Sequence, residues 1–277
     1  MTKKNIDNSK KNKLIDFPNF TKHRLTIAVC TGKGGIGKTS FMTMIAASVK
    51  DSYLIYTDVM SKFSGLIEKR RMSENEYNLR HLTVEQVIYT NEKNETVDEI
   101  NKFFQEKVFN VVNPPEGEEG HDLTLFIDLF GFETEMQKYL LMNANLILIP
   151  AGLGELQKQS LIGTSENLAK LTRELNEGKA TKRKIEGVVF LNRKPKGNVN
   201  VNDELKEFYE TVQSLDNLHL LETEIHESND IFKAANKGCS VTELPKIKYR
   251  RSAKEYKSLI DELGFELHNK NNNNKGV

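Results

Sequence analysis

The 277-residue sequence contains no tryptophan, six prolines and two cysteines. Two thiols in one chain, Cys30 and Cys239, exclude a disulfide framework and a four-thiolate metal site. The first residues, MTKKNIDNSKKNK, are basic, and no apolar segment typical of a signal peptide follows them. The longest apolar run, residues 144–153, is interrupted by Asn145 and Pro150 and is far shorter than the roughly 18 residues that span a bilayer. We therefore expect a soluble, cytoplasmic protein.

Charge of one sign is not in excess, because 40 Lys and Arg residues face 39 Asp and Glu residues. Binding to nucleic acid or membrane would therefore depend on local clusters of basic residues. Apolar residues make up 38% of the chain, and with the 17 glycines this approaches the usual globular level. We expect a flexible basic tail at residues 1–22, one folded domain at 23–266 and a disordered Asn-rich tail at 267–277.

Short β-rich runs alternate with helical patterns between the tails. The expected strands are 25–30, 53–57, 108–112, 123–128, 146–150, 185–191 and 218–225. The expected helices are 39–50, 97–104, 133–142, 157–175, 203–215 and 252–263, and residues 61–120 are the least regular part. Runs such as LTLFID and NLILIP lack polar alternation, which is typical of strands covered on both faces. The pattern predicts an α/β fold with a mostly parallel, twisted sheet and helices on both faces.

A glycine- and lysine-rich segment, CTGKGGIGKTS at residues 30–40, follows the first expected strand. It opens a helix that is expected to carry Phe41, Met44, Ile45 and Val49 on one apolar face. This context is what a phosphate-binding P-loop requires. Glycines let successive amides turn toward an anion, and the helix N-terminus adds roughly half a positive charge. Lys38 would bridge the β- and γ-phosphates and Thr39 would offer its hydroxyl to Mg²⁺, whereas a glycine-rich turn with incidental lysines is the alternative. The expected phosphate-binding residues are Gly34, Gly35, Ile36, Gly37, Lys38, Thr39 and Ser40.

A second lysine, Lys33, distinguishes this segment from an ordinary P-loop. With it, the sequence resembles the deviant-Walker ATPases of the ParA/MinD family, most closely the ParA-like partition proteins, over residues 24–265. The resemblance implies a single P-loop NTPase domain that binds ATP or ADP with Mg²⁺. It also implies a homodimer formed with ATP, in which Lys33 reaches the phosphates bound to the partner. A solvated loop lysine is the alternative for Lys33.

Three later segments extend the resemblance. LTLFIDLFG, residues 123–131, looks like a Walker B strand, so Asp128 would hold Mg²⁺ through water, although such an Asp can instead cap a helix. IEGVVFLNRKPKG resembles the adenine-side strand, where Asn192 is a candidate base contact. LETEIHESND resembles a late loop of the family, in which Ile225 and His226 could border the base or be structural.

One segment departs from the family pattern. The family has Asp-x-Asp-Pro-Gln after the second strand, whereas this chain has Tyr56-Thr-Asp-Val-Met-Ser. If Asp58 aligns with the second Asp, the catalytic carboxylate is present and Tyr56 replaces the first. If Asp58 aligns with the first, Met60 occupies the catalytic position. We predict a slow ATPase with Lys33, Lys38 and Asp58 as the catalytic residues.

The resemblance implies an ATPase that binds DNA non-specifically and acts in plasmid partition, with hydrolysis stimulated by a ParB-like centromere-binding adaptor. Such a protein would be nucleoid-associated when ATP is bound. Alternatives are a nucleotide-gated scaffold with little hydrolysis, a MinD-like positioning ATPase, for which the acidic C-terminal end is unsuited to anionic lipid, and a metal-cluster carrier, which would need paired cysteines. The candidate DNA-binding residues are Lys248, Arg250, Arg251 and Lys254.

Overall fold

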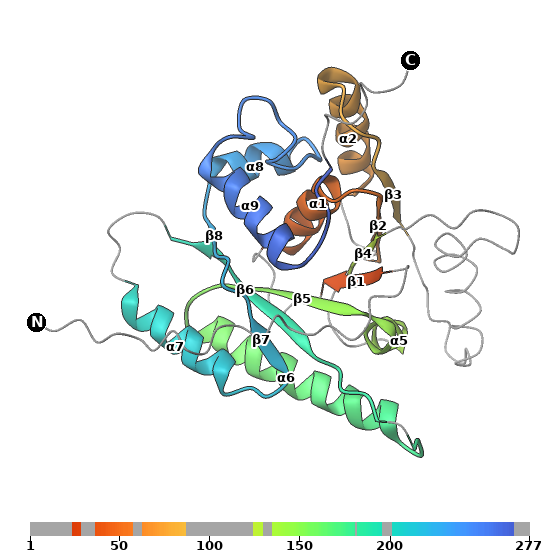
Figure 1. Cartoon of the computed structure of the whole chain (residues 1–277), viewed down its shortest axis with the longest axis vertical. Coiled ribbons are helices and arrows are strands. Elements are labelled where there is room, and N and C mark those ends of the chain that lie inside the picture. Colours follow the sequence, from red (N-terminus) through yellow and green to blue (C-terminus); the bar gives the residue numbers. More distant parts are fainter. Residues whose placement is uncertain are drawn as a thin grey trace, which may run out of the picture.

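A computed structural model describes residues 24–28, 37–57, 63–86, 124–129, 135–180, 182–195 and 201–268 (Figure 1). The strands are β1 (Arg24–Ala28), β2 (Ser52–Tyr56), β3 (Thr83–Gln86), β4 (Thr124–Asp128), β5 (Leu146–Ala151), β6 (Gly187–Lys194), β7 (Leu218–Leu220) and β8 (Ile225–His226). The helices are α1 (Lys38–Ser48), α2 (Phe63–Tyr77), α5 (Glu135–Asn143), α6 (Glu155–Asn176), α7 (Asn202–Gln213), α8 (Asn229–Ala235) and α9 (Arg251–Glu262).

The strands form one parallel sheet in the order β3-β2-β4-β1-β5-β6-β7. Strand β8 pairs with the C-terminal part of β6, after the part that pairs with β7. Parallel neighbours need crossover connections, and helices supply them. The expected α/β fold with a parallel sheet is therefore confirmed. Because every strand runs the same way, their carboxyl ends meet at one edge of the sheet, where α1 begins.

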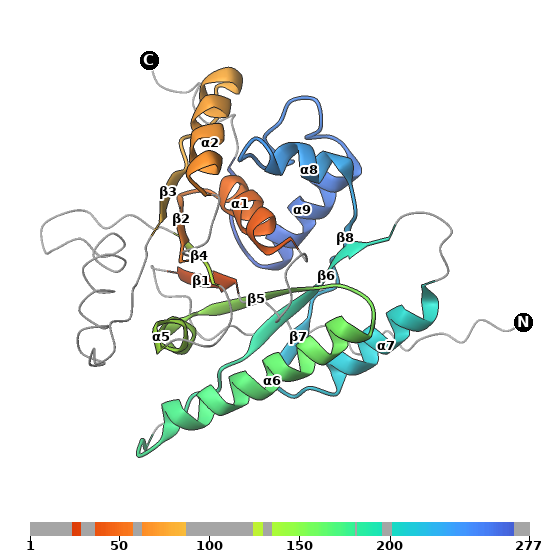
Figure 2. The ribbon, with the colours of Figure 1, turned by 180° about the vertical axis from the view of Figure 1, so that it is seen from behind.

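Alternate residues of the central strands enter two separate apolar cores. On β4, Phe126 packs with α1, α8 and α9, whereas Leu125 and Ile127 pack with α5, α6 and α7. The same alternation separates Leu148 from Ile149 on β5. Helices consequently cover both faces of the sheet, with α6 and α7 on one side and α1, α8 and α9 on the other (Figures 1 and 2).

Helix α1 is buried along its length. The sequence predicts one apolar face, but residues 41–48 are all buried. The reason is that α1 lies between the sheet and a second layer formed by α8 and α9, so it has no solvent-facing side. A helix that is apolar all round is stable only when it is covered in this way.

Two further expectations differ from the structure. The run 218–225 is not one strand, because it divides into β7 and β8, which both pair with β6. The region 61–120 contains α2 and β3, which the sequence did not predict, because the charged run FSGLIEKRRMSENEY has no apolar stripe. The predicted strand 108–112, helix 97–104 and most of both tails lie outside the described residues.

A buried ion pair fixes α2 to the segment that follows α8. The Arg70 guanidinium donates to both Glu243 carboxylate oxygens at 2.7 and 2.9 Å, and its Nε donates to Glu74 at 2.8 Å. Burial alone would lower the pKa of Arg70, but the Glu243 and Glu74 carboxylates together outweigh burial and raise it. Gly238 lets the two segments approach, because its φ is +63° and an added Cβ would lie 2.9 Å from Arg70 Cβ.

Candidate functional site

The N-terminus of α1 has features that favour binding of an anion. Gly37 precedes the helix with φ +82°, a left-handed conformation that favours glycine, and its carbonyl accepts from the Phe41 amide at 2.8 Å. The first turn, from Lys38 to Ser40, carries no acidic side chain, so the positive end of the helix dipole is not offset there. The other predicted phosphate-binding residues and the second lysine lie outside the described residues: Lys33, Gly34, Gly35 and Ile36.

A hydroxyl and a carboxylate meet beside this helix end. Thr39 Oγ1 donates to Asp128 Oδ2 at 2.6 Å, which joins α1 to the last residue of β4. Asp128 is buried, and its backbone carbonyl accepts from the Thr57 amide and hydroxyl at 3.3 and 3.0 Å. Hydroxyl and carboxylate oxygens are ligands that Mg²⁺ prefers, and Mg²⁺ usually takes only one or two protein ligands together with phosphate and water. The donor set therefore fits the predicted metal.

The hydroxyls of Tyr56 and Thr43 form a hydrogen-bonded chain, here called the hydroxyl relay, that ends on the Thr39 carbonyl. Thr43 Oγ1 donates to the Thr39 carbonyl at 2.8 Å and lies 2.7 Å from the Tyr56 hydroxyl. Tyr56 is fully buried and stands opposite Asp128 in the β2–β4 register. Burial strongly raises the pKa of Tyr56, so this side chain stays neutral. Asp58 and Met60 lie outside the described residues.

A small cavity of about 20 Å³ lies beside the N-terminus of α1. Gly37, Ser40 and Asn192 line it, together with Tyr256 from α9. Asn192 therefore lies close to the start of α1, and its contact with the base remains a prediction. Ile225, its partner in the β6–β8 register, is instead buried in the core.

The cavity is also lined by Arg193 and Phe232, which the sequence did not single out. Arg193 has φ +59°, and its guanidinium carbon lies 5.5 Å from the centre of the Phe232 ring. An added Cβ at Gly37 would lie 3.3 Å from Arg193 Nε, so the guanidinium packs against the N-terminus of α1. The available signal was the position of Arg193 directly after Asn192, toward the carboxyl end of a buried strand.

The His226 side chain is held by α9. Its Nδ1 lies 2.9 Å from Glu255 Oε1, and Arg251 Nη2 lies within 3.0 Å of both ring nitrogens. Burial lowers the pKa of His226, the charges of Arg251 and Lys194 lower it further, and Glu255 opposes them.

A second ionic cluster lies beside His226. Glu224 accepts from Lys194 at 2.6 Å and from the Tyr209 hydroxyl. Burial would raise the pKa of Glu224, but these two hydrogen bonds outweigh it and lower the pKa. Burial and the Glu224 carboxylate raise the pKa of Tyr209 to about 12. This cluster ties β6 to the turn before β8.

The four candidate DNA-binding residues do not form one uniform patch. Arg250 pairs with Asp230 at 2.8 Å, and Arg251 pairs with Glu255 at 2.7 Å. Lys254 is exposed on α9, and Lys248 lines a different cavity.

Within the described ranges, no group of three or more His, Cys, Asp or Glu side chains could hold a metal ion. Among the described residues, Thr39 and Asp128 are the candidates to hold Mg²⁺. The described helices include none with the length and apolar character needed to cross a membrane.

A parallel α/β sheet that brings a helix N-terminus, a hydroxyl and a carboxylate together at its carboxyl edge defines a nucleotide-binding protein of the P-loop class. The family model described as "CobQ/CobB/MinD/ParA nucleotide binding domain" matches residues 27–241. The chain belongs to this family, and its fold is that of the ParA/MinD-type ATPases. Comparison with curated proteins gives no match.

Solved structures with the same fold include three whose names describe different systems. The ATP complex of McdA from Cyanothece has a TM-score of 0.57 at 16% identity, covering 90% of this chain and 100% of that one. MinD in the MinC:MinD cell division complex of Aquifex aeolicus has a TM-score of 0.54 at 16% identity, covering 89% and 98%. A plasmid partition protein from Borrelia burgdorferi has a TM-score of 0.52 at 15% identity, covering 87% and 98%.

Proposed function

We propose that this protein is a ParA-like ATPase that forms an ATP-sandwich dimer, binds DNA non-specifically and acts in DNA partition with slow, partner-stimulated hydrolysis. The observation that carries the nucleotide part is the 2.6 Å contact between Thr39 Oγ1 and Asp128 Oδ2 beside the N-terminus of α1. Membership of the nucleotide-binding family and the likeness in fold to a plasmid partition protein support the same proposal.

The residues of this chain divide the work on MgATP. The amides at the start of α1 and the Lys38 ammonium bind phosphate oxygens. Thr39 and, through water, Asp128 would hold Mg²⁺, which would supply positive charge to offset that of the phosphates. Asp58 orients the attacking water, and Lys33 contacts the nucleotide of the partner protomer. Because phosphoryl transfer depends mainly on positioning and charge, a site whose water-positioning group is missing or partial hydrolyses ATP slowly.

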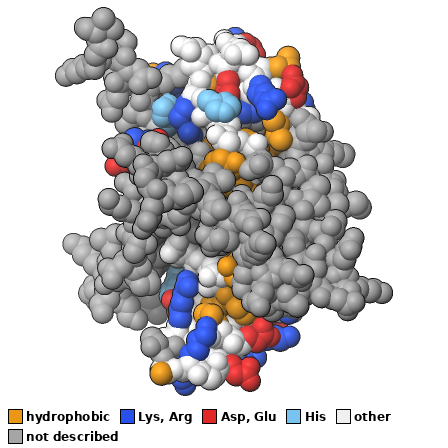
Figure 3. Space-filling view, turned by 90° about the vertical axis from the view of Figure 1, so that its right-hand side faces the viewer, with side chains coloured by type: hydrophobic (Ala, Val, Ile, Leu, Met, Phe, Trp, Pro, Cys, Tyr) orange, Lys and Arg blue, Asp and Glu red, His pale blue; other side chains and the backbone are white. Residues whose placement is uncertain are grey.

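DNA binding in this proposal rests on basic side chains near α9. Arg250 and Arg251 share their charge with carboxylates, so Lys248 and Lys254 are the stronger candidates for phosphate contacts. On the face shown in Figure 3, described basic side chains are interspersed with acidic ones. Each phosphate contact contributes roughly −0.9 to the slope of log K against log salt. A slope near −2 per protomer is therefore expected, and a basic N-terminal tail could add to it.

The metal assignment is tested by comparing Asp128→Asn with Asp51→Asn. Both changes replace one carboxylate oxygen by an NH₂ group. Asp51, however, is exposed between α1 and β2, away from the edge of the sheet where the strands have their carboxyl ends. We expect Asp128→Asn to lower Mg²⁺-dependent phosphate release at least tenfold and Asp51→Asn to stay within twofold of wild type. Phosphate release is measured over a range of Mg²⁺ concentrations. Wild-type turnover by Asp128→Asn at every concentration refutes the assignment.

The dimer is tested in the same preparations by light scattering with MgATP. Lys33→Ala should remain monomeric, whereas Lys170→Ala, on the exposed side of α6, should dimerise like wild type. Duplex DNA should be retained only by the dimeric forms. If Lys33→Ala dimerises with the same affinity as wild type, the ATP-sandwich dimer is contradicted. If DNA binding is the same with and without nucleotide, the scaffold alternative is favoured.

A further inference from the structure

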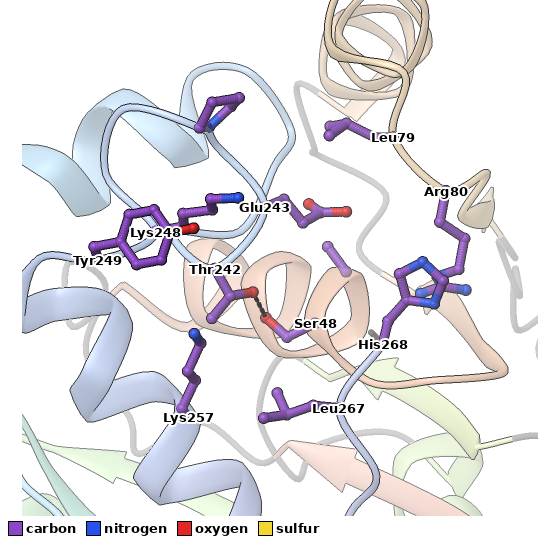
Figure 4. Close-up of a pocket in the computed structure, with 12 residues that line it drawn as sticks. Ser48, Leu79, Arg80, Thr242, Glu243, Lys248, Tyr249, Lys257, Leu267 and His268 are labelled. Carbon is purple, nitrogen blue, oxygen red and sulfur yellow. Dashed lines mark hydrogen bonds between the residues drawn. The ribbon is translucent and has the colours of Figure 1, made fainter. Parts of the chain in front are cut away.

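We propose that a second site, unrelated to the nucleotide, binds an acidic peptide segment of a partner protein. The site is a cavity of about 310 Å³ between the end of α1, the loop after α2, the segment 242–249, α9 and the segment 267–268 (Figure 4). It lies at the C-terminal end of α1, whereas the phosphate site lies at the N-terminal end. Eleven helical residues separate the two ends, which at 1.5 Å per residue is on the order of 16 Å.

Three cationic side chains from three different elements reach this cavity: Arg80, Lys248 and Lys257. Figure 4 shows them on different sides of the opening. Within the described residues, none of the three forms an ion pair with a carboxylate, although Lys248 also lies over the Tyr249 ring at 4.9 Å. The two lysines are half-buried, so a carboxylate bound between them would be screened by water less than one on an open surface.

The one carboxylate that lines the cavity does not neutralise these cations. Glu243 is already bound by both terminal nitrogens of Arg70 and accepts from the Ser240 amide at 2.8 Å. Among the described residues, Arg80 hydrogen-bonds to neutral groups and not to a carboxylate: its Nη2 donates to the carbonyls of Ala46 and Val49 at 3.1 and 2.9 Å. Its charge therefore remains available to an anion in the cavity.

The remaining wall combines polar residues, such as Ser48 and Thr242, with an apolar part, and the apolar part favours a peptide over other anions. Leu79, Leu267 and Ala47 line the cavity, and Tyr249 stands beside it with 74% of its surface exposed. A DNA duplex is a wide convex cylinder that cannot enter such a hollow, and a free anion would leave the apolar wall unused. An extended segment with carboxylates on either side of an aliphatic residue matches both kinds of surface.

The chain itself offers a poor occupant from the adjoining end. The nine residues after His268, NKNNNNKGV, contain two lysines and no Asp or Glu. Charge complementarity therefore points to a partner. The proposal does not depend on ATP or on a dimer, but it uses Lys248, which is also a candidate DNA contact. Loss of peptide binding without loss of DNA binding in the lysine variants described next would separate the two proposals.

The absence of tryptophan gives a local reporter. In a Tyr249→Trp protein, the only indole lies at the cavity, and fluorescence is titrated with the acetylated and amidated peptide GELEGELEG at 50 mM salt. We expect saturable binding that weakens at least tenfold for the glutamine peptide GQLQGQLQG and for Lys248→Gln/Lys257→Gln. Lys206→Gln removes one positive charge from the exposed surface of α7, as each cavity substitution removes one from the cavity. It should change the affinity for the peptide less than twofold. The charge-reversed Lys257→Glu should bind more weakly than wild type without unfolding, as checked by circular dichroism.

Several results would overturn the proposal. They are no saturation up to 1 mM peptide, equal affinity for the glutamine peptide, or equal loss with Lys206→Gln. Saturation by glutarate at the same concentration as the peptide would instead make this a small-anion site. Displacement of the peptide by duplex DNA, with loss of DNA binding in the same lysine variants, would assign the cavity to nucleic acid.

Discussion

Replacing Tyr56 by Phe tests whether the buried relay holds the first turn of α1. Thr43 has one hydroxyl hydrogen, and it is donated to the Thr39 carbonyl, so the Tyr56 hydroxyl must be the donor in the 2.7 Å contact with Thr43. The change removes this donor and almost no volume. A buried neutral hydrogen bond contributes about 1 kcal/mol to the free energy of unfolding, so Tyr56→Phe should lose about that amount.

A double-mutant cycle separates the relay from other effects of the substitution. Thr43→Val keeps the side-chain shape but removes both hydrogen bonds, and it should cost about 1–2 kcal/mol. The double variant should lose less than the sum of the singles, by about 0.5–1 kcal/mol, because both changes remove the same contact. Urea denaturation without nucleotide measures each value, with the slope m held constant.

Tyr249→Phe is the matched control, because that hydroxyl belongs to an exposed side chain. It should stay within about 0.5 kcal/mol of wild type. The reasoning is refuted if Tyr56→Phe is as stable as this control and the coupling with Thr43→Val is zero. A smaller Mg²⁺ dependence of ATP binding in Tyr56→Phe would further connect the relay to Thr39.

Two more predictions concern backbone and titration. Gly238→Ala should lower the free energy of unfolding, measured by denaturant titration, by about 2 kcal/mol or more. Gly178→Ala should lower it by about 1 kcal/mol. Both glycines have positive φ, but only at Gly238 would the added Cβ lie close to Arg70. Equal losses would contradict the close approach. Because the pKa of His226 is lowered by folding, the unfolded chain binds the proton first as pH falls, and stability drops below about pH 6.5. The stability of His226→Gln should depend less on pH between 7 and 5, and an unchanged slope would show that folding does not lower this pKa.

The order of strands and helices could be predicted because buried parallel strands produce recognisable apolar runs. The expected 146–150 run is β5, and its alternate residues serve two cores. Helix α2 could not be predicted in this way, because its stability depends on a distant partner. Arg70 reads as a surface charge in the sequence, yet it is buried against Glu243, which is 173 positions away.

The candidate site was predictable where one motif carries the chemistry. Gly37 and Thr39 follow from local spacing, and Asp128 follows from the end of an apolar strand. The contacts of Tyr56 and Arg193 could not be predicted, because they depend on which strands are neighbours and on how far α8 and α9 lean toward α1. Such side chains acquire their roles only when segments far apart in the sequence are brought together.

The closing contacts of α1 come from the far end of the chain. Leu267 pairs with Val49, and the His268 amide donates to the Ser48 carbonyl at 2.8 Å. Phe265 packs on Phe126 of β4, in the same core as α1, with ring centres 5.6 Å apart. During synthesis on the ribosome, these contacts of α1 therefore cannot form until residues 267 and 268 have emerged. Nascent chains of this protein should depend on chaperones until release, because long-range contacts of this kind form late.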